Sequence, residues 1–225
     1  MSNMFSSFFF DMDGVIFDSM PHHAQAWEIV MGNHGLPFTA RDCYLQEGRT
    51  GQSVIREAIW TAEHREATEE EIWPIYWEKT NLFHELGGAV PMRGIEHVLA
   101  YLKENDKSIY IVTGSGQQTL FDTLSDYFPG VFARERMVTA FDVKHGKPDP
   151  EPYLKAWEKS GCTKDQCCVI ENAPLGIRAA KAAGLFTIGV NTGPLQDEDL
   201  AREGADVVLP DMEALLCWLQ EHVNL

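Results

Sequence analysis

Short apolar runs alternate with amphipathic stretches along most of this chain. The runs have the length and composition of buried strands, and the stretches repeat apolar residues at helical spacing. The predicted strands cover residues 8–10, 108–112, 137–138, 168–170, 187–190 and 206–209. The predicted helices in the same part of the chain cover residues 95–103, 117–127, 152–160, 175–183 and 212–219. This alternation predicts an α/β fold with a doubly wound parallel sheet, a Rossmann-like architecture.

One long segment breaks this rhythm. Between residues 19 and 87 there is almost no strand pattern, and helical periodicity covers residues 21–31, 52–62 and 69–82. Gly87, Gly88 and Pro91 then mark the return to the alternating pattern. We therefore predict an α/β core of residues 1–17 and 88–225, and a helical cap of residues 18–87 inserted after the first strand. We expect an insertion at this point to sit over the crevice at the carboxyl ends of the strands, where it acts as a lid.

The charge balance narrows the range of partners. The 225 residues carry 34 acidic against 18 basic side chains, a formal net charge of −16. Nucleic acids and anionic membranes require basic surfaces, so we expect neither as a partner. A small-molecule phosphate substrate is compatible, provided that a metal ion or a few Lys and Arg side chains supply local positive charge.

Several features indicate a cytoplasmic monomer. No apolar run approaches the roughly 20 residues of a membrane span, and the first residues lack the basic region of a signal peptide. The five cysteines are odd in number and include no CxxC pair, which suits free thiols in a reducing compartment. We expect a monomer because the lid must move.

Two carboxylates follow the first predicted strand. The aromatic run at residues 8–10 ends in Asp11, and Asp13 and Gly14 come directly after it. Strand side chains alternate, so Asp11 and Asp13 share a side only if the backbone stays extended. Carboxylates beside a core are costly unless they are paired or bind a cation. Their placement indicates a nucleophile, an acid/base and a metal site.

The other strand ends carry the remaining groups that phosphoryl transfer needs. In chain order these are Thr113, Gly114 and Ser115 after the second strand, Lys147 after the third, and Glu171 with Asn172 at the fourth. A carboxylate can attack phosphorus, and a second acid can move the proton of the leaving group. A hydroxyl followed by small residues lets backbone N–H groups hold phosphate oxygens, and a lysine supplies a fixed positive charge. Thr113 has a simpler alternative as a helix-capping or turn residue.

These motifs, in this order, resemble the four motifs of the haloacid dehalogenase-like superfamily. The resemblance covers nearly the whole chain, and the helical insertion together with the small residues of 176–184 is similar to the β-phosphoglucomutase-like branch. It implies that Asp11 is the nucleophile and Asp13 the general acid/base, and that Thr113 and Lys147 bind the phosphoryl group. It also implies Mg²⁺ as the cofactor, bound by Asp11, the carbonyl of Asp13 and a residue of the fourth motif.

One position departs from the family pattern. Much of the family has aspartate where this chain has Asn172, so an oxygen ligand is kept but a charge is lost. We expect Glu171 to restore part of that charge, either directly or through a metal-bound water. We also hypothesise that Glu47, in the glycine-bracketed loop of residues 47–51, reaches the metal when the lid closes. The alternative for Glu47 is a solvated turn residue. The same cap motif resembles a family member that hydrolyses inorganic pyrophosphate.

The cap offers two cations and one aromatic pair to the crevice. Arg49 and Lys79 suit a second anionic group of the substrate, and their alternative is a surface position. His23 and Trp27 lie four residues apart on a predicted helix and so share a face. They match positions that face the acid/base in the mutase-like branch, and a packed core pair is the alternative. Ser19, at the predicted hinge, is expected to cap the helix that follows it.

Three functions fit these residues. The first is Mg²⁺-dependent hydrolysis of inorganic pyrophosphate or a sugar phosphate through an aspartyl-phosphate on Asp11. The second is a mutase of the β-phosphoglucomutase type, which must keep water away from the same intermediate. Against the mutase, Arg49 lies one position away from where its arginine is expected. The third is a non-catalytic binding protein, which is disfavoured because Asp11, Asp13 and Lys147 are all present.

Overall fold

Six parallel strands form the sheet of the computed structural model, which describes residues 5–116 and 120–223. In chain order they are β1 (Ser7–Phe10), β2 (Ser108–Val112), β3 (Met137–Val138), β4 (Cys167–Glu171), β5 (Phe186–Val190) and β6 (Val207–Leu209). Their order across the sheet is β3-β2-β1-β4-β5-β6. The strand order therefore reverses beside β1, which is where an open parallel sheet forms its ligand crevice. This confirms the predicted α/β fold with a doubly wound parallel sheet.

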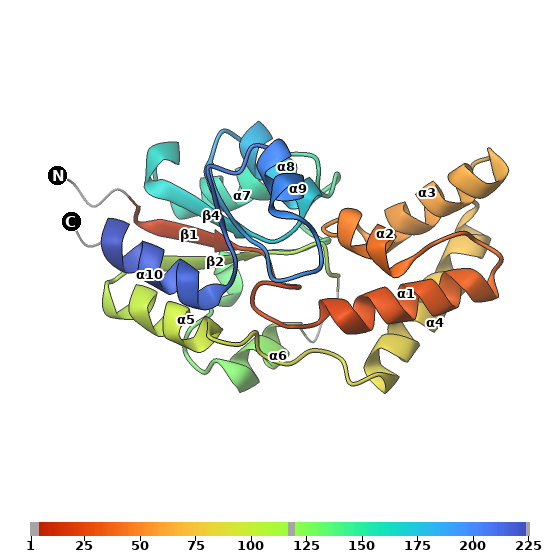
Figure 1. Cartoon of the computed structure of the whole chain (residues 1–225), viewed down its shortest axis with the longest axis horizontal. Helices are drawn as coiled ribbons and strands as arrows, with labels where there is room; N and C mark the ends of the chain where they lie inside the picture. Colours follow the sequence, from red (N-terminus) through yellow and green to blue (C-terminus); the bar gives the residue numbers. More distant parts are fainter. Residues whose placement is uncertain (1–4, 117–119, 224–225) are drawn as a thin grey trace.

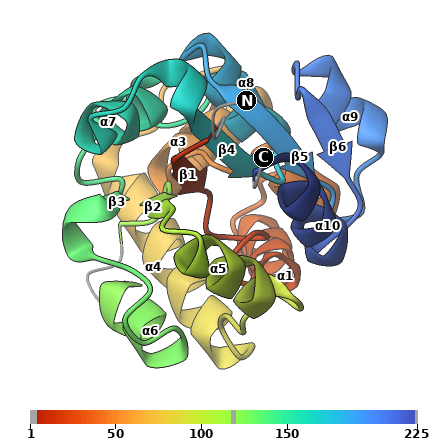
Figure 2. The same cartoon turned by 90° about the vertical axis from the view of Figure 1, so that its left-hand side faces the viewer.

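Helices cover both faces of this sheet (Figure 1 and Figure 2). Those on one face are α5 (Ile95–Glu104), α6 (Leu120–Tyr127) and α10 (Met212–His222), and those on the other are α7 (Glu151–Ser160) and α8 (Pro174–Ala182). Alternation along β1 explains the two layers, because Phe8 and Phe10 join the first apolar cluster whereas Phe9 joins the second. All three rings are fully buried, and each contributes roughly 1.5–3 kcal/mol by leaving water.

Four helices occupy residues 19–87, all of which the structure describes, at the carboxyl end of the strands (Figure 1). They are α1 (Met20–Asn33), α2 (Ala40–Leu45), α3 (Gly51–Glu63) and α4 (Glu69–Glu85). The four helices bury an apolar cluster of their own, in which Trp27, Met31, Ile55 and Ile72 take part. This helical layer thus has packing that is independent of the two clusters beside the sheet.

The chain enters and leaves the helical layer through two adjacent backbone segments. The Asp18 N–H donates to the Val90 carbonyl at 2.8 Å, and the Met92 N–H donates to the Ile16 carbonyl at 2.8 Å. Gly87, at a φ of 114°, turns the chain out of α4 in a conformation that side chains with a Cβ rarely adopt. A narrow double connection of this kind is a usual location for a hinge.

Two short helices escape the periodicity analysis: α2 and α9 (Asp197–Arg202). Six residues hold too few apolar positions to show a helical repeat. Both helices begin with reciprocal capping, which in α2 joins Thr39 and Asp42 in both directions. The predicted helix at 117–127 begins outside the described residues, and its described part starts at Leu120. None of the helices within residues 5–116 and 120–223 is long and apolar enough to cross a membrane.

Candidate active site

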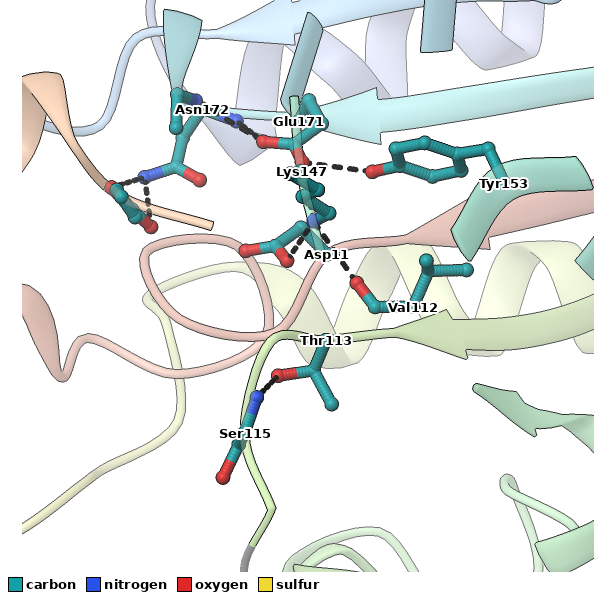
Figure 3. Close-up of polar contacts among 10 residues, drawn as sticks. Asp11, Val112, Thr113, Ser115, Lys147, Tyr153, Glu171 and Asn172 are labelled. Carbon is teal, nitrogen blue, oxygen red and sulfur yellow. Dashed lines mark hydrogen bonds and ion pairs between the residues drawn. The ribbon is translucent and has the colours of Figure 1, made fainter. Parts of the chain in front are cut away.

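Asp11 follows β1 directly and is nearly buried, with Lys147 against it (Figure 3). Lys147 Nζ donates to Asp11 Oδ1, to the Val112 carbonyl at 3.1 Å and to Glu171 Oε1 at 2.6 Å. An ammonium group has three N–H donors, and these three acceptors use all of them. The lysine is therefore held as a fixed positive charge beside the carboxylate, although it comes from the segment after β3.

Glu171 ends β4, and its carboxylate is fully engaged (Figure 3). Oε1 accepts from Lys147 Nζ at 2.6 Å and from the Tyr153 hydroxyl at 2.8 Å. Oε2 accepts from the backbone N–H groups of Asn172 at 3.0 Å and Ala173 at 3.2 Å. With two donors on each oxygen, the carboxylate is saturated by protein contacts in this structure. These contacts make Glu171 the counter-ion of Lys147, and its role as a metal ligand, direct or through water, stays a prediction.

Asp13 has a different set of neighbours. The Ser19 hydroxyl donates to Asp13 Oδ1 at 2.5 Å, and His23 Nε2 lies 3.3 Å from the same oxygen. Lys79 Nζ lies 2.5 Å from His23 Nδ1. We assign a neutral imidazole that accepts from the ammonium and donates to Asp13. Burial and the charge of Lys79 lower the pKa of His23, which favours this neutral form.

The two aspartates differ in proton affinity. Burial raises the pKa of Asp11 to about 7, against the opposing effect of Lys147. Burial acts in the same direction on Asp13, but the contacts with His23 and Ser19 prevail, and the pKa of Asp13 lies below its usual value. One strand end thus presents two acids of unequal strength, a pattern typical of sites with separate nucleophile and acid/base roles.

The contact of Ser19 with Asp13 replaces the helix cap that the sequence predicts. Ser19 occupies the N-cap position of α1, but its side chain makes no capping hydrogen bond. Its backbone is helical, at φ −104° and ψ −19°, rather than extended as in a usual N-cap. Pro21, in the first turn, also has no N–H to be capped. The capping prediction is wrong for these two reasons, and the hydroxyl is free to bind the carboxylate.

A cap residue, Glu47, meets the end of β4. Asn172 Nδ2 donates to both carboxylate oxygens of Glu47, each at 3.0 Å. Gly14 makes room for this amide, because a Cβ at position 14 would lie 2.1 Å from Asn172 Nδ2. Glu47 is 9% exposed, and burial, followed by the charges of Asp11 and Glu171, raises the pKa of Glu47 well above its usual value. The structure therefore places Glu47 inside the site rather than in a solvated turn.

Three oxygen-bearing side chains at this point, Asp11, Glu47 and Asn172, together with the expected backbone carbonyl of Asp13, suit a hard divalent cation. Asn172 Oδ1 is buried and has no hydrogen-bond partner among the described residues, which is costly unless something binds it. Burial first, and neighbouring acids second, raise the pKa values of Asp11 and Glu47, and a bound cation would offset this cost of ionisation. On both counts the residues present fit Mg²⁺.

Residues 113–115 form the turn after β2 (Figure 3). Thr113 is nearly buried, and its Oγ1 accepts from the Ser115 N–H at 3.0 Å, which is the turn contact considered as its simpler role. Thr113, Gly114 and Ser115 line the same cavity as Asp11. The turn contact and a phosphate contact are compatible, so phosphate binding by these residues stays a prediction.

A cavity of about 340 Å³ lies between the sheet and the helical cap. The predicted cap residues His23, Trp27, Arg49 and Lys79 all line it. Lys79 Nζ lies 5.0 Å from the centre of the Trp27 ring, and burial lowers the pKa of Lys79 to about 8. Arg49 pairs with Glu57 at 3.5 Å, and its Nε is buried without a partner among the described residues. These four side chains therefore face the site, and their roles stay predictions.

The loop that carries Glu47 closely approaches two segments of the core. A Cβ on Gly48, whose φ is 90°, would lie 2.8 Å from Lys147 Cδ. A Cβ on Gly114 would lie 2.8 Å from the Gly48 carbonyl oxygen. Glycine at both positions allows this approach of backbone to backbone and to the lysine stem. The loop of residues 47–51 therefore lies against the core backbone in this structure.

Two further residues near the site are not singled out by the sequence analysis. Tyr153 is fully buried on α7 and contacts Glu171. Its only sequence signal is a hydroxyl-bearing ring among the apolar positions of a buried helix face. Gln46 lines the cavity, and its Oε1 is buried without a partner among the described residues. Its signal is its place next to Glu47 in the cap loop.

Comparison with known proteins identifies the family that shares these motifs. Residues 5–184 match the haloacid dehalogenase-like hydrolases. A phosphorylated carbohydrates phosphatase of Thermotoga maritima is 30% identical over 220 residues, which cover 94% of this chain and 97% of the relative. Hexitol phosphatase A of Escherichia coli is 31% identical over 188 residues, which cover 82% of each chain.

Solved structures with similar sequences share the whole fold. A Bacteroides vulgatus protein, provisionally called a β-phosphoglucomutase, is 45% identical with a TM-score of 0.94, and the match covers 100% of this chain and 92% of that one. A β-phosphoglucomutase from Clostridium difficile is 25% identical with a TM-score of 0.80, and the match covers 98% of both chains.

Proposed function

The chain belongs to the haloacid dehalogenase-like hydrolases, and from that membership we propose that it is a Mg²⁺-dependent phosphohydrolase of small phosphorylated compounds. One observation carries the proposal: Asp11 is paired with Lys147 beside a cavity that Asp13 and Thr113 also line and that the cap loop closes. Nothing in the packing of the core requires a buried carboxylate at this strand end, whereas phosphoryl transfer requires both partners.

Asp11 acts as the nucleophile in this proposal. A carboxylate oxygen of Asp11 forms a bond to phosphorus while the bond from phosphorus to the leaving oxygen breaks, which gives an aspartyl-phosphate. Lys147 opposes the effect of burial and so favours the ionised form of Asp11, and it balances the negative charge of the arriving phosphoryl group. Water then attacks the phosphorus, phosphate departs, and the carboxylate of Asp11 is restored.

Asp13 acts as the acid/base. Its low pKa, set by His23 and Ser19, means that it waits as a carboxylate in the closed site. In that form it can take the proton of the attacking water directly. The same low pKa means that Asp13 is rarely protonated and so donates a proton to the leaving group less readily. This environment therefore suits a leaving group of low basicity.

Mg²⁺ would be held by Asp11, Asp13, Asn172 and Glu47, and it would supply positive charge to the phosphoryl oxygens. Because Glu47 belongs to the cap, we propose that this set is complete only when the cap is closed. Residues 18–87 would then act as one moving cap on the core of residues 1–17 and 88–225. One chain provides every residue in this account, so a monomer suffices.

Two substrate classes are supported by different observations. Inorganic pyrophosphate has a weakly basic leaving group, which the ionised form of Asp13 favours. It also has a second anionic group, which the cations Arg49 and Lys79 could bind. Sugar phosphates are supported by the relatives, whose names include phosphatases of phosphorylated carbohydrates and hexitols. We propose pyrophosphate or a sugar phosphate as the substrate, in that order.

A phosphate-release screen tests this proposal. Purified protein is assayed with pyrophosphate, a panel of sugar phosphates and nucleotides, each with Mg²⁺ and with chelator. We expect Mg²⁺-dependent release from one of the first two classes and no release with chelator. Absence of release from every compound would contradict the proposed hydrolysis.

A mutase is the second candidate, and the placement of His23 favours it. His23 contacts the proposed acid/base at 3.3 Å, where it can also meet the hydroxyl that receives the phosphoryl group. Incubation with β-glucose 1-phosphate separates the two functions: a mutase gives glucose 6-phosphate, and a hydrolase gives free phosphate. We expect free phosphate and no glucose 6-phosphate.

A further inference from the structure

Tyr153 is fully buried beneath the proposed site and does not line the cavity. Figure 3 shows its ring on α7 pointing toward Glu171 and Lys147. The hydroxyl donates to Glu171 Oε1 at 2.8 Å, and the ring centre lies 5.1 Å from Lys147 Nζ. This side chain contacts the two charged groups that hold Asp11 in place without reaching the substrate space.

Glu171 is confined to one position by its surroundings. Its Oε2 is fixed by two backbone N–H groups. A Cβ on Gly176 would lie only 1.8 Å from Oε1, so α8 packs directly against the carboxylate. The other oxygen, Oε1, accepts from both the Tyr153 hydroxyl and Lys147 Nζ. The carboxylate therefore has one orientation, and Tyr153 helps to set it.

The position of Glu171 in turn fixes the lysine. Of the three acceptors of Lys147 Nζ, the Val112 carbonyl and Glu171 Oε1 belong to the sheet, and Asp11 Oδ1 belongs to the nucleophile. Two rigid acceptors direct the third N–H at Asp11. A shift of Glu171 would move the ammonium group away from the line of attack, and small displacements of this kind are costly in phosphoryl transfer.

We propose that Tyr153 is a positioning residue: its hydroxyl fixes Glu171, Glu171 fixes Lys147, and Lys147 fixes Asp11 for attack. The proposal rests on the proposed function, because it assigns Tyr153 a part in the same reaction. Tyr153 does not touch the substrate, so its loss acts on the chemical step rather than on substrate binding.

The test compares Tyr153→Phe with Tyr110→Phe in the holoenzyme. Both tyrosines belong to the same apolar cluster and are at least 95% buried. Tyr110, however, packs on Phe9, and its hydroxyl makes no hydrogen bond to Glu171 among the described residues. Each change removes one oxygen and keeps the ring. With the substrate found in the screen, we expect Tyr153→Phe to lower kcat about 10-fold while KM changes less than about 2-fold. We expect Tyr110→Phe to leave both constants near the wild-type values.

A double-mutant cycle with Glu171→Gln tests the route of the effect. If Tyr153 acts through Glu171, the fall in kcat caused by Tyr153→Phe shrinks when Gln occupies position 171. Independent, multiplicative effects of the two changes would overturn the proposal. So would equal kcat values for Tyr153→Phe and the wild type, or equal losses in the two tyrosine variants, which would indicate packing alone.

Failure of the proposed function is seen separately, in the wild-type protein. A wild type that releases no phosphate from any compound refutes the hydrolase. An active wild type whose kcat is insensitive to Tyr153→Phe refutes the positioning role and leaves the hydrolase in place. A crystal structure of Tyr153→Phe adds a readout that needs no substrate: we expect the Glu171 carboxylate and the Lys147 ammonium to shift together from their wild-type positions, and an unmoved pair would contradict the proposal.

Discussion

At the residue scale, the site depends on carboxylates in unequal surroundings. Burial beside other acids raises the pKa of Asp11 and of Glu47, whereas donors from Ser19 and His23 lower the pKa of Asp13. Each shift has a chemical use. A bound cation can neutralise the ionised forms of Asp11 and Glu47, and Asp13 is already ionised and can accept a proton.

Mg²⁺ is expected to stabilise the protein more strongly as pH rises. Without metal, the pKa of Asp11 is raised from 3.8 to about 7. Proton binding by Asp11 therefore contributes to the free energy of unfolding in full below about pH 4, and this contribution is lost as pH rises through about 7. Mg²⁺ binds the deprotonated groups and replaces those protons. Thermal unfolding with MgCl2 and with chelator, at about pH 5 and about pH 8, should show the larger gain at the higher pH. An equal gain at both values would contradict this charge assignment.

Glu47→Gln is expected to weaken the response to Mg²⁺. The amide keeps the size of the side chain but removes a proposed ligand charge, so the Mg²⁺ concentration for half-maximal activity should rise about 10-fold or more. Glu57→Gln is the matched control, because Glu57 is on the same cap but half exposed and pairs with Arg49. An unchanged Mg²⁺ dependence in Glu47→Gln would end the proposal that the cap completes the metal site.

At the element scale, the important contact is between two loops. The cap loop before α3 and the turn after β2 meet through Gly48 and Gly114 with no side chain between them. Helices and strands provide rigid supports on either side, and the paired segments at residues 16–18 and 90–92 provide the connection. Closure therefore depends on the absence of a Cβ at a few positions.

Gly114→Ala is expected to prevent full closure. The new Cβ would lie 2.8 Å from the Gly48 carbonyl oxygen and 3.2 Å from the Arg49 carbonyl oxygen, and backbone atoms cannot turn aside as a side chain can. We expect kcat/KM to fall roughly 100-fold, as for other displacements near 1 Å in an active site. Gly116→Ala, in the same loop, is the control. The nearest atoms to its Cβ among the described residues would be side-chain atoms of Phe141, at 3.3 Å, and of Ala140. Similar losses in both variants would argue against the closure contact.

At the scale of the whole molecule, the sequence was sufficient for the fold and for which residues gather at the strand ends, whereas their roles stay predictions. The strands were predictable because buried apolar runs such as Phe8 to Phe10 have few alternatives, and the helices of 19–87 because that segment has almost no strand pattern. Parallel strands bring their carboxyl ends to one edge, so Asp11, Thr113 and Asn172 could be placed together from strand ends alone.

The remaining features depend on tertiary contacts that leave little trace in the sequence. Glu171 turns to Lys147 because Tyr153 and two backbone N–H groups hold it there, and no spacing rule reports that choice. Ser19 binds Asp13 because the hinge brings α1 beside the strand end. The short helix α2 is fixed by its cap rather than by a repeat. Each of these features depends on which of several possible partners a polar group selects.

The most direct test of the account is to locate the phosphoryl group on the enzyme. Wild-type protein mixed with its substrate is quenched in acid within the first turnovers, digested and analysed by mass spectrometry. The account predicts one added phosphoryl group on the peptide that contains Asp11, none in Asp11→Asn, and a fall in turnover on the order of 10³-fold or more in that variant. A phosphoryl group on another residue, or wild-type turnover by Asp11→Asn, would contradict it.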